Sequence, residues 1–449
     1  MYRKSLLGDA DSSVLSYTSS LEDDREIVGE VVESLIAHLK VLSAQGLIPE
    51  EKARKILDEL ESLLRDPSPL FSIEAEDVHE AIEIYLKEKL GEDEGYLALG
   101  KSRNDHVSSA LRLKAKKLLL EQVKELLNLR KVLLEKAEGH LHTVMPAFTH
   151  LQPAQPSTFA HYLCHIEEIL ADYTKALFFA LELVDKSPLG GGAVGGTSVP
   201  LEREALADEL FGGMVFNSIA ATSSRDFLSV ASSLDVCLSV FLSRIAEDVV
   251  VFSTPQFNYL ILPREHLATS SMMPQKKNAV TMEIARAWGA ESMGHLVALL
   301  GILKGIPTGY NLDMQEANRH ALRILKGTLE TLRVFTDLFS KIEVNEESLL
   351  RDARIFPILA TDVAERVALM SGRPYREVYS EVAGLVRESR NAGEFYAKVR
   401  DKYGIEPSLE EGIKKPVAGS PNPERVKEYI ELAKKALERD SSRLMSLQK

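Results

Sequence analysis

One stretch of the sequence limits the possible folds more than any other: residues 107–140 contain no proline and one glycine, with leucines throughout. Extended as one helix, this segment would measure about 50 Å. Four later segments have the same character, at about 156–186, 224–251, 278–304 and 316–342. Several of them exceed the usual length of a globular helix. Long apolar helices joined by short loops predict a helical bundle and an all-α fold class.

The apolar positions of these helices are too numerous for a single stripe. Runs such as 118–120 (L-L-L) and 249–252 (V-V-V-F) place apolar side chains on several faces of one helix. A helix that is apolar on more than one face is buried on more than one side. The pattern therefore predicts that copies of the chain associate through the bundle.

Shorter helical patterns flank the bundle. Segments at about 22–44, from 50 to the prolines near 67, and 76–90 have helical spacing of apolar residues, and after Phe356 the helices shorten again. No internal repeat and no convincing strand run is found. We therefore predict three domains: an N-terminal helical domain (1–106), a central bundle (107–356) and a small C-terminal helical domain (357–449).

Charge and cysteine content exclude several classes of protein. The net charge of −13 argues against a nucleic-acid binder that relies on a basic face. Cys164 and Cys237 each lie within an apolar helical pattern, which favours free thiols in a reducing compartment. No apolar segment follows the first charges, and no run of about 18 apolar residues is found. We expect a soluble cytoplasmic protein with no nucleic-acid or membrane partner.

The segment 268–278, A-T-S-S-M-M-P-Q-K-K-N, has a composition that core packing does not require. Two hydroxyls, two ammonium groups and two amides lie on a proline-containing loop that leads into a helix. Backbone N–H groups and the dipole of a helix N-terminus favour an anion such as a carboxylate there. Ser270, close to Lys276, is a candidate proton-transfer group. The alternative is a solvated basic loop in which Asn278 caps the helix.

Three other loops carry chemically capable residues beside the long helices. Arg103 and Asn104 are suited to carboxylates and amides, or form an ordinary helix cap. Thr149 and His150 precede a proline-marked helix start, where a histidine can transfer a proton or be purely structural. The glycine-rich segment 190–197 is either an anion-binding turn or a flexible connector.

Other chemistries find little support. The glycine-rich segment lacks the lysine pattern and the preceding strand of a P-loop. His161 and His165 have i,i+4 spacing, but no third metal ligand is evident and the intervening residues are not those of a zinc protease. The sequence has no G-x-S-x-G elbow on a strand-to-helix turn. We therefore expect no metal site.

Taken together, the loops resemble those of the fumarase/aspartase superfamily. The Q-K-K-N ending of segment 270–278 is similar to that of the argininosuccinate lyase branch. The resemblance extends from about residue 17 to the C-terminus. The other matching segments, in chain order, are S-S with Asp24 at 19–24, E-D-V-H at 76–79, S-R-N-D at 102–105, T-H-L-Q-P-A-Q-P at 149–156, S-R-D-F at 224–227 and Y-N-L-D-M-Q-E at 310–316.

This resemblance implies a three-domain fold whose central bundle forms a homotetramer, with each active site shared between subunits. It also implies the reversible, cofactor-free cleavage of L-argininosuccinate to L-arginine and fumarate. Ser270 would remove a proton and His150 would protonate the departing nitrogen, although the reverse assignment is nearly as plausible. The substrate-binding residues implied are Ser20, Arg103, Asn104, Thr149, Arg225, Lys276, Asn278, Tyr310 and Gln315, with Asp77, Glu283 and Arg319 in support.

The sequence departs from the family pattern at several positions. Thr269 replaces the usual glycine, Ala279-Val280 replaces P-D, and Asn318 stands where many members carry a lysine. Because of these changes, the resemblance does not define which residues contact the guanidino side of the substrate. Two alternatives remain: another fumarate-releasing lyase, such as adenylosuccinate lyase or aspartase, or a non-catalytic crystallin-like structural protein. The composition of the Ser270 loop also suggests that it closes over substrate.

Overall fold

The structure of this protein is a computed structural model that describes residue 8 and residues 11–448. Helices dominate, and within these residues the strands form only three two-stranded antiparallel sheets. The all-α fold class is thus confirmed. The chain divides into two compact units, each built from three segments. The first unit comprises 1–121, 176–237 and 291–329, and the second comprises 122–175, 238–290 and 330–449.

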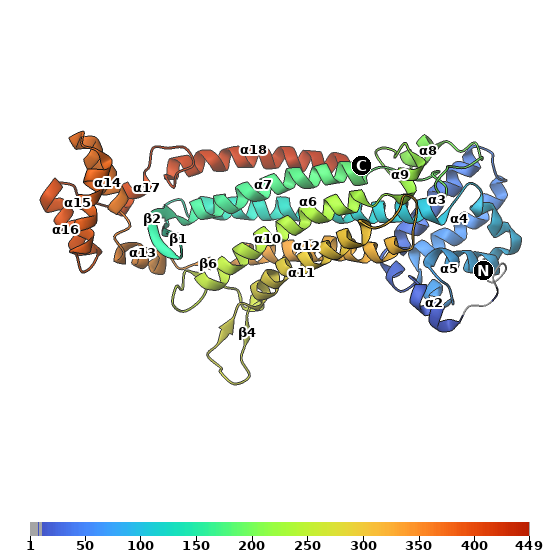
Figure 1. Ribbon diagram of the computed structural model, residues 1–449, viewed down its shortest axis with the longest axis horizontal. Helices are drawn as coiled ribbons and strands as arrows, with labels where there is room; N and C mark the ends of the chain where they lie inside the picture. Colours follow the sequence, from blue (N-terminus) through green and yellow to red (C-terminus); the bar gives the residue numbers. More distant parts are fainter. Residues whose placement is uncertain (1–7, 9–10, 449) are drawn as a thin grey trace. The chain divides into compact units, whose positions relative to one another are not determined.

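Five long helices form the elements that the sequence predicted as a bundle (Figure 1). Their bounds agree with the predicted ones, and the largest difference is at the start of α6, predicted at 107 and observed at Arg103. The division into three domains stays a prediction. The five helices are α6 (Arg103–Gly139), α7 (Phe159–Val184), α10 (Asp226–Phe252), α11 (Val280–Leu303) and α12 (Asp313–Lys341).

The first unit contains the N-terminal helices, whose ends follow local sequence signals. Pro49 directly precedes α4, and Asp77 caps α5 by accepting the Glu80 backbone N–H at 2.7 Å. Its shorter elements are α2 (Ser12–Thr18), η1 (Asp23–Glu26), α3 (Val28–Ala44), α4 (Glu50–Arg65), η2 (Ser68–Ser72), α5 (Val78–Leu90), η3 (Gly91–Ala98), α8 (Arg203–Asp208) and α9 (Ser218–Ser223).

The second unit contains the short strands and the C-terminal helices. Its C-terminal helix α18 is held by the fully buried Arg130, which contacts Glu167 at 2.8 Å and Asp440 of α18 at 2.7 Å. Its elements are β1 (Val144–Thr149), β2 (Gln152–Thr158), β3 (Leu260–Ile261), η4 (Arg264–His266), β4 (Ala268–Thr269), β5 (Lys277–Asn278), β6 (Glu343–Val344), α13 (Glu346–Ile355), α14 (Ala360–Ser371), α15 (Tyr375–Arg387), α16 (Ala392–Tyr403), α17 (Leu409–Ile413) and α18 (Pro423–Leu447).

The β1–β2 hairpin is the main departure from the sequence-based expectation, which found no convincing strand run. Residues Val144–Thr149 pair with Gln152–Thr158 through a two-residue turn. Three prolines in this region, Pro146, Pro153 and Pro156, hide the strand pattern, because proline cannot donate to a ladder and is depleted in strands. As a result α7 begins at Phe159, after the hairpin, and not near Pro156.

One helix, α10, is long and apolar enough by length and composition to cross a membrane. More than half of its most apolar 18-residue window, 56%, is buried inside the protein. Buried core helices of water-soluble proteins have the same composition, so α10 fits the interior of a bundle.

Candidate active site

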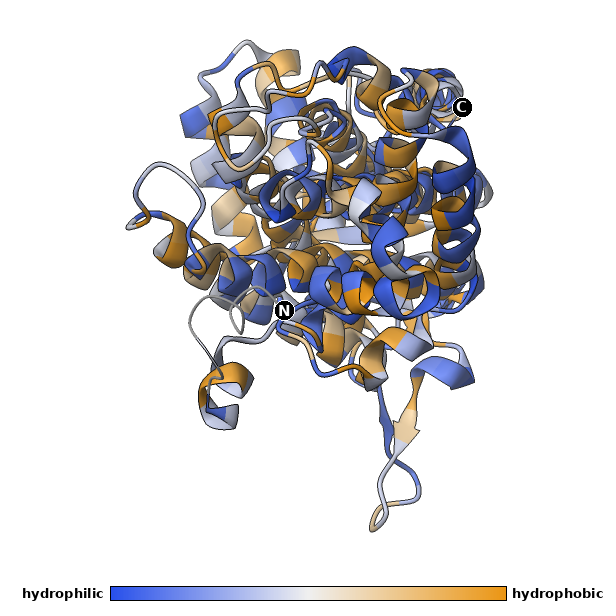
Figure 2. Ribbon diagram, turned by 90° about the vertical axis from the view of Figure 1, so that its right-hand side faces the viewer, coloured by the Kyte–Doolittle hydropathy of each residue, from blue (hydrophilic) through white to orange (hydrophobic). Residues whose placement is uncertain are grey.

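Ser270 lies at the start of an exposed loop between two very short strands. β4 and β5 pair Ala268 with Asn278 and Thr269 with Lys277. The loop extends away from the start of α11 in Figures 1 and 2. The Ser270 hydroxyl oxygen accepts the backbone N–H groups of Met272 at 3.2 Å and Met273 at 3.1 Å. Among the described residues, the Ser270 side chain therefore forms hydrogen bonds only within its own loop.

The cationic and amide groups of this loop also face solvent. Lys276 is exposed, and Asn278 lies in β5 two residues before α11 begins. Glu283, in the first turn of α11, is exposed too. Among the described residues, no hydrogen bond joins Glu283 to Lys276 or His150. Asn278 does not cap α11 directly, so the loop carries more polar groups than helix capping requires.

Thr149 and His150 lie at the tip of the β1–β2 hairpin, and both are exposed. His150 and Leu151 have φ values of 54° and 57°. Turns with positive φ at both central residues favour Asn-Gly, because a Cβ in this conformation costs roughly 1–2 kcal/mol per residue. A His-Leu pair therefore strains the backbone here, and strain of this kind is concentrated at functional sites.

In the first unit, Ser20 belongs to a chain of polar contacts between the N-terminal segment and α5. Its hydroxyl donates to Asp24 Oδ2 at 2.9 Å, and the same oxygen accepts the Val78 backbone N–H at 3.0 Å. Asp77 accepts a hydrogen bond from Arg103 Nη1 at 3.0 Å. Burial raises the pKa of Asp24 to about 6, and the nearby Asp77 contributes in the same direction. A carboxyl group that titrates near neutrality thus lies beside the predicted substrate-binding serine.

Asn104 and the glycine-rich segment are in direct contact. Asn104 Nδ2 donates to the carbonyl of Ala193 at 3.1 Å, and the buried Asp105 accepts the Gly192 backbone N–H at 3.0 Å. A Cβ at Gly192 would lie 2.3 Å from the carbonyl oxygen of Gly196, so only glycine fits this closed turn. The turn therefore contacts the segment that contains Asn104, and the Gly192 backbone N–H is already bonded to Asp105.

Arg225 is a fully buried cation whose partners are all uncharged. Its Nε donates to Asn318 Oδ1 at 3.3 Å, and its Nη1 donates to the carbonyls of Thr222 and Ser224. Its Nη2 is buried and has no hydrogen-bond partner among the described residues. Burial lowers the pKa of Arg225 to about 10, and the nearby Tyr310 acts in the opposite direction. An unpaired buried donor of this kind is suited to an anion.

The remaining predicted residues of the first unit make local contacts. Gln315 Nε2 donates to the carbonyl of Thr18 at 3.2 Å, which connects α12 to the segment before Ser20. Arg319 forms exposed ion pairs with Asp23 at 2.6 Å and Glu316 at 2.9 Å. The first contact places the Gln315 side chain against Thr18, two residues before Ser20, whereas Arg319 is a surface residue.

The predicted residues fall into two sets. One set (Ser20, Asp77, Arg103, Asn104, Arg225, Tyr310, Gln315 and Arg319) belongs to the first unit, and the other (Thr149, His150, Ser270, Lys276, Asn278 and Glu283) to the second. Within the described part of the second unit, no hydrogen bond joins the side chains of Ser270 and His150. Asp24 and Asn318 were not predicted as site residues. The i,i+4 spacing of Asp24 from Ser20 could have indicated that their side chains are in contact.

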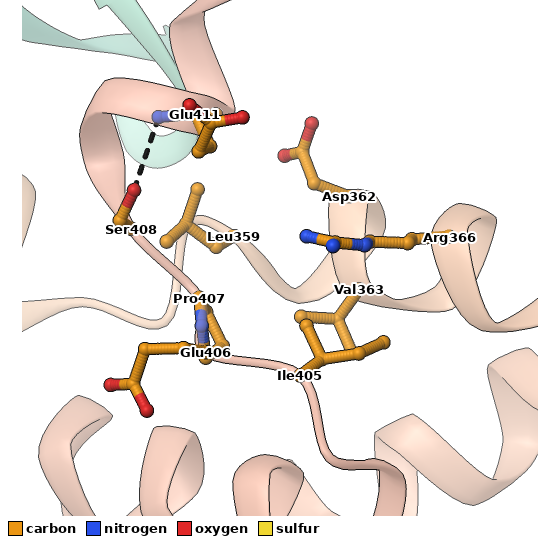
Figure 3. Close-up of a pocket in the computed structure, with 10 residues that line it drawn as sticks. Leu359, Asp362, Val363, Arg366, Ile405, Glu406, Pro407, Ser408 and Glu411 are labelled. Carbon is orange, nitrogen blue, oxygen red and sulfur yellow. Dashed lines mark hydrogen bonds between the residues drawn. The ribbon is translucent and has the colours of Figure 1, made fainter.

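Two other features do not belong to this site. His161 uses both ring nitrogens, with Ser157 Oγ and the carbonyl of Gly419 each at 2.9 Å, so it is structural. No group of three or more metal-ligating side chains is found among the described residues. A cavity of about 280 Å³ between α14 and α17 is shown in Figure 3, where Asp362 and Arg366 lie opposite Ser408 and Glu411. None of the predicted site residues lines it.

Comparison with known proteins identifies close relatives. A family model described as a lyase matches residues 6–294. The chain is 60% identical to the argininosuccinate lyase of Pyrococcus furiosus, covering 100% of this chain and 97% of that protein. It is 41% identical to the argininosuccinate lyase of Sulfolobus acidocaldarius, covering 97% and 93%.

Solved structures show the same fold at lower identity. The structure of EDDS lyase in complex with formate matches with a TM-score of 0.84 and 24% identity, covering 98% of this chain and 93% of that one. A class II fumarase from Schistosoma mansoni matches with a TM-score of 0.70 and 18% identity, covering 91% and 90%.

Proposed function

Since this chain belongs to the argininosuccinate lyase family, we propose that it cleaves L-argininosuccinate reversibly into L-arginine and fumarate, the last step of arginine biosynthesis. The observation that carries this proposal is the 60% identity over the entire chain to a relative of that name. The chain is accordingly a carbon–nitrogen lyase. The departures from the family pattern leave the proposed proton-transfer pair, Ser270 and His150, in place.

In the proposed reaction, Ser270 removes a proton from the methylene carbon of the succinyl group. The electron pair spreads onto the adjacent carboxylate as a dianionic aci-carboxylate. This pair then forms the double bond of fumarate while the C–N bond breaks, and His150 protonates the departing guanidino nitrogen. The atoms balance without a cofactor.

The transition state carries extra negative charge on one carboxylate, so fixed donors around its oxygens provide most of the stabilisation. Lys276, Asn278 and the backbone N–H groups before α11 are the proposed donors. Ser20, Asn104, Thr149, Tyr310 and Gln315 hold the rest of the substrate. Arg103 and the buried Arg225 supply positive charge, and Asp77 orients Arg103 through their 3.0 Å contact.

We infer that the functional form is a homotetramer with shared active sites. Helix α11 exposes an apolar stripe at Met293 (52% exposed), Val297 (73%) and Leu300 (45%), which are spaced by four and three residues. A second copy of the chain would cover this stripe as in a helical bundle. Association would also give Ser270 partners beyond its own loop. Sedimentation should then give about four times the chain mass of 49.8 kDa. We further infer a cytoplasmic location, which the free thiols of Cys164 and Cys237 fit.

The test is an absorbance assay for fumarate with argininosuccinate and adenylosuccinate as parallel substrates. Release of fumarate from argininosuccinate, with L-arginine as the second product, is expected. Turnover of adenylosuccinate alone would show that the chain is a different fumarate-releasing lyase. Absence of turnover by the intact oligomer with either substrate would favour a structural role.

A further inference from the structure

His266 lies at the base of the Ser270 loop and uses both of its ring nitrogens. It ends η4, two residues before β4, and its side chain is 5% exposed. Its Nδ1 is 2.8 Å from Thr281 Oγ1 in the first turn of α11. Its Nε2 is 2.9 Å from Asp337 Oδ2 in α12. The imidazole therefore bridges the two sides of the loop base and ties them to a third element.

The partners of His266 define the direction of both hydrogen bonds. Asp337 also pairs with Lys341 at 2.7 Å, which favours its ionised, acceptor-only form. The Nε2 of His266 must then carry the proton that it donates to Asp337. In the neutral ring Nδ1 accepts, so the Thr281 hydroxyl donates to it. Lys341 also pairs with Glu265, the residue before His266, at 2.9 Å.

The loop itself has little else to orient it. Its ladder contains only two residues per strand, and a hairpin this short is marginal in water. Residues 269–277 are exposed apart from Ser270, which is half-buried, and the described hydrogen bonds of Ser270 stay within the loop. The direction in which Ser270 points is therefore set by the residues that flank the ladder, namely His266 on one side and Thr281 on the other.

We propose that His266 is a positioning residue of the active site, holding the base of the Ser270 loop against α11 and α12 through Thr281 and Asp337. This rests on the proposed role of Ser270 in the lyase reaction. The β4–β5 end of the loop then stays fixed while the exposed segment between the two strands adapts to substrate. Loss of the imidazole would let both short strands rotate away from α12 and would misalign Ser270.

Four variants test this proposal in the full-length oligomer. His266→Phe removes both hydrogen bonds, whereas His266→Gln keeps a donor that can reach Asp337. Thr281→Val removes only the α11 contact. Lys341→Met is the control, because it deletes the exposed ion pairs with Asp337 and Glu265 and removes neither partner of the imidazole.

Hydrogen exchange of the peptide spanning the loop is the first measurement, and it requires no assumption about the substrate. We expect amide exchange in 268–278 to rise about tenfold in His266→Phe, since the ladder loses its anchor. The rise should be smaller in Thr281→Val and His266→Gln, and absent in Lys341→Met. Exchange in α3 and α5 should not change. An unchanged loop in His266→Phe would overturn the anchoring role.

Steady-state kinetics with argininosuccinate is the second measurement. For His266→Phe we expect kcat to fall by about tenfold or more with a much smaller change in KM, because the alignment of Ser270 and of the transition-state donors Lys276 and Asn278 is lost while the substrate-binding groups outside the loop remain. His266→Gln should recover most of the parental kcat. Faster loop exchange with parental kcat in His266→Phe would show a purely structural anchor and overturn the positioning role.

The two measurements also separate this proposal from the proposed function. If the parental protein turns over neither argininosuccinate nor a related substrate, the proposed function fails while the exchange comparison still decides whether His266 anchors the loop. If the parental protein is active and His266→Phe matches it in both measurements, the positioning proposal fails alone.

Discussion

Ser20 and Asp24 are joined by a 2.9 Å hydrogen bond in which the serine hydroxyl donates to the carboxylate one turn later. Asp24 also accepts the Val78 backbone N–H, so this carboxyl group connects the N-terminal segment to the start of α5. Burial raises its pKa to about 6, well above the ordinary value of 3.8. A predicted substrate-binding residue thus depends on a group that changes charge near neutral pH.

Asp24→Asn should stabilise the protein more at pH 8 than at pH 5. The folded state binds the Asp24 proton more tightly than the unfolded state, so the fold loses stability as the pH rises from the ordinary pKa of 3.8 to the folded pKa of about 6, and no more above it. Removing the charge should therefore add about 3 kcal/mol at pH 8 and about half of that at pH 5. Thermal unfolding of both proteins at the two pH values measures this. Equal effects at both would contradict the raised pKa.

Acid should destabilise the first unit through three buried histidines, His38, His79 and His106. Burial lowers the pKa of His38 and His79 to about 4, and that of His106 well below its ordinary value of 6.5. In the unfolded chain these histidines bind protons at a higher pH than in the folded protein. Their contribution to the stability of the fold is therefore constant above pH 6.5 and is lost as the pH falls toward 4.

His79→Leu should therefore lose less stability than the parental protein between pH 7 and pH 4.5. Both ring nitrogens of His79 are buried without a hydrogen-bond partner among the described residues, so an apolar side chain of similar size is tolerated. The midpoint of thermal unfolding against pH is the measurement. The exposed His142→Leu is the control and should follow the parental curve.

Ser270→Ala should reduce kcat by about 10²-fold or more with the oligomer intact, as expected when a proton-transfer group is removed. The neighbouring Ser271→Ala is the control, because it removes the same hydroxyl group from the same loop. Its kcat should stay within about threefold of the parental value. Near-parental turnover by Ser270→Ala would remove Ser270 from the proposed role.

Asn318→Asp should raise stability and KM together. A carboxylate at the acceptor position, 3.3 Å from Arg225 Nε, would pair with a buried cation that has no charged partner, adding on the order of 1–2 kcal/mol. This ion pair would compensate the positive charge of Arg225. The guanidinium would then attract substrate carboxylates less, so KM should rise about tenfold. Asn318→Ala should raise KM but lower stability. Parental KM in both variants would place Arg225 outside the substrate site.

Asp440→Asn should destabilise the protein by about 2–4 kcal/mol, because it removes a charged partner from the fully buried Arg130. Proteolysis of α18 should become faster, since Asp440 is the α18 residue that pairs with Arg130. Lys434→Ala is the control on the same helix. Its exposed ion pair with Glu138 should contribute less than about 1 kcal/mol. Equal losses of stability in the two variants would contradict the proposal that the buried Arg130 holds α18 through Asp440.

The five bundle helices were predictable because their signals are local, whereas α18, with 25 residues, contradicts the expectation that the helices shorten after Phe356. The proline-free run before His140 and the proline before Glu50 mark α6 and α4 within the sequence itself. The β1–β2 hairpin was not predictable, because its prolines and its His-Leu turn contradict the usual composition of strands and tight turns. Its pairing is decided by contacts with other parts of the chain.

The candidate site shows the same division. The sequence alone predicted which loops carry the chemistry, because the serine, lysine, histidine and arginine side chains of a proton-transfer and carboxylate site are recognisable by type and spacing. Tertiary structure alone decided that Asp24 receives the Val78 backbone N–H, that Arg225 is buried against Asn318, and that His266 joins Thr281 to Asp337. These pairs depend on burial and on approaches between distant segments, and no local pattern encodes either.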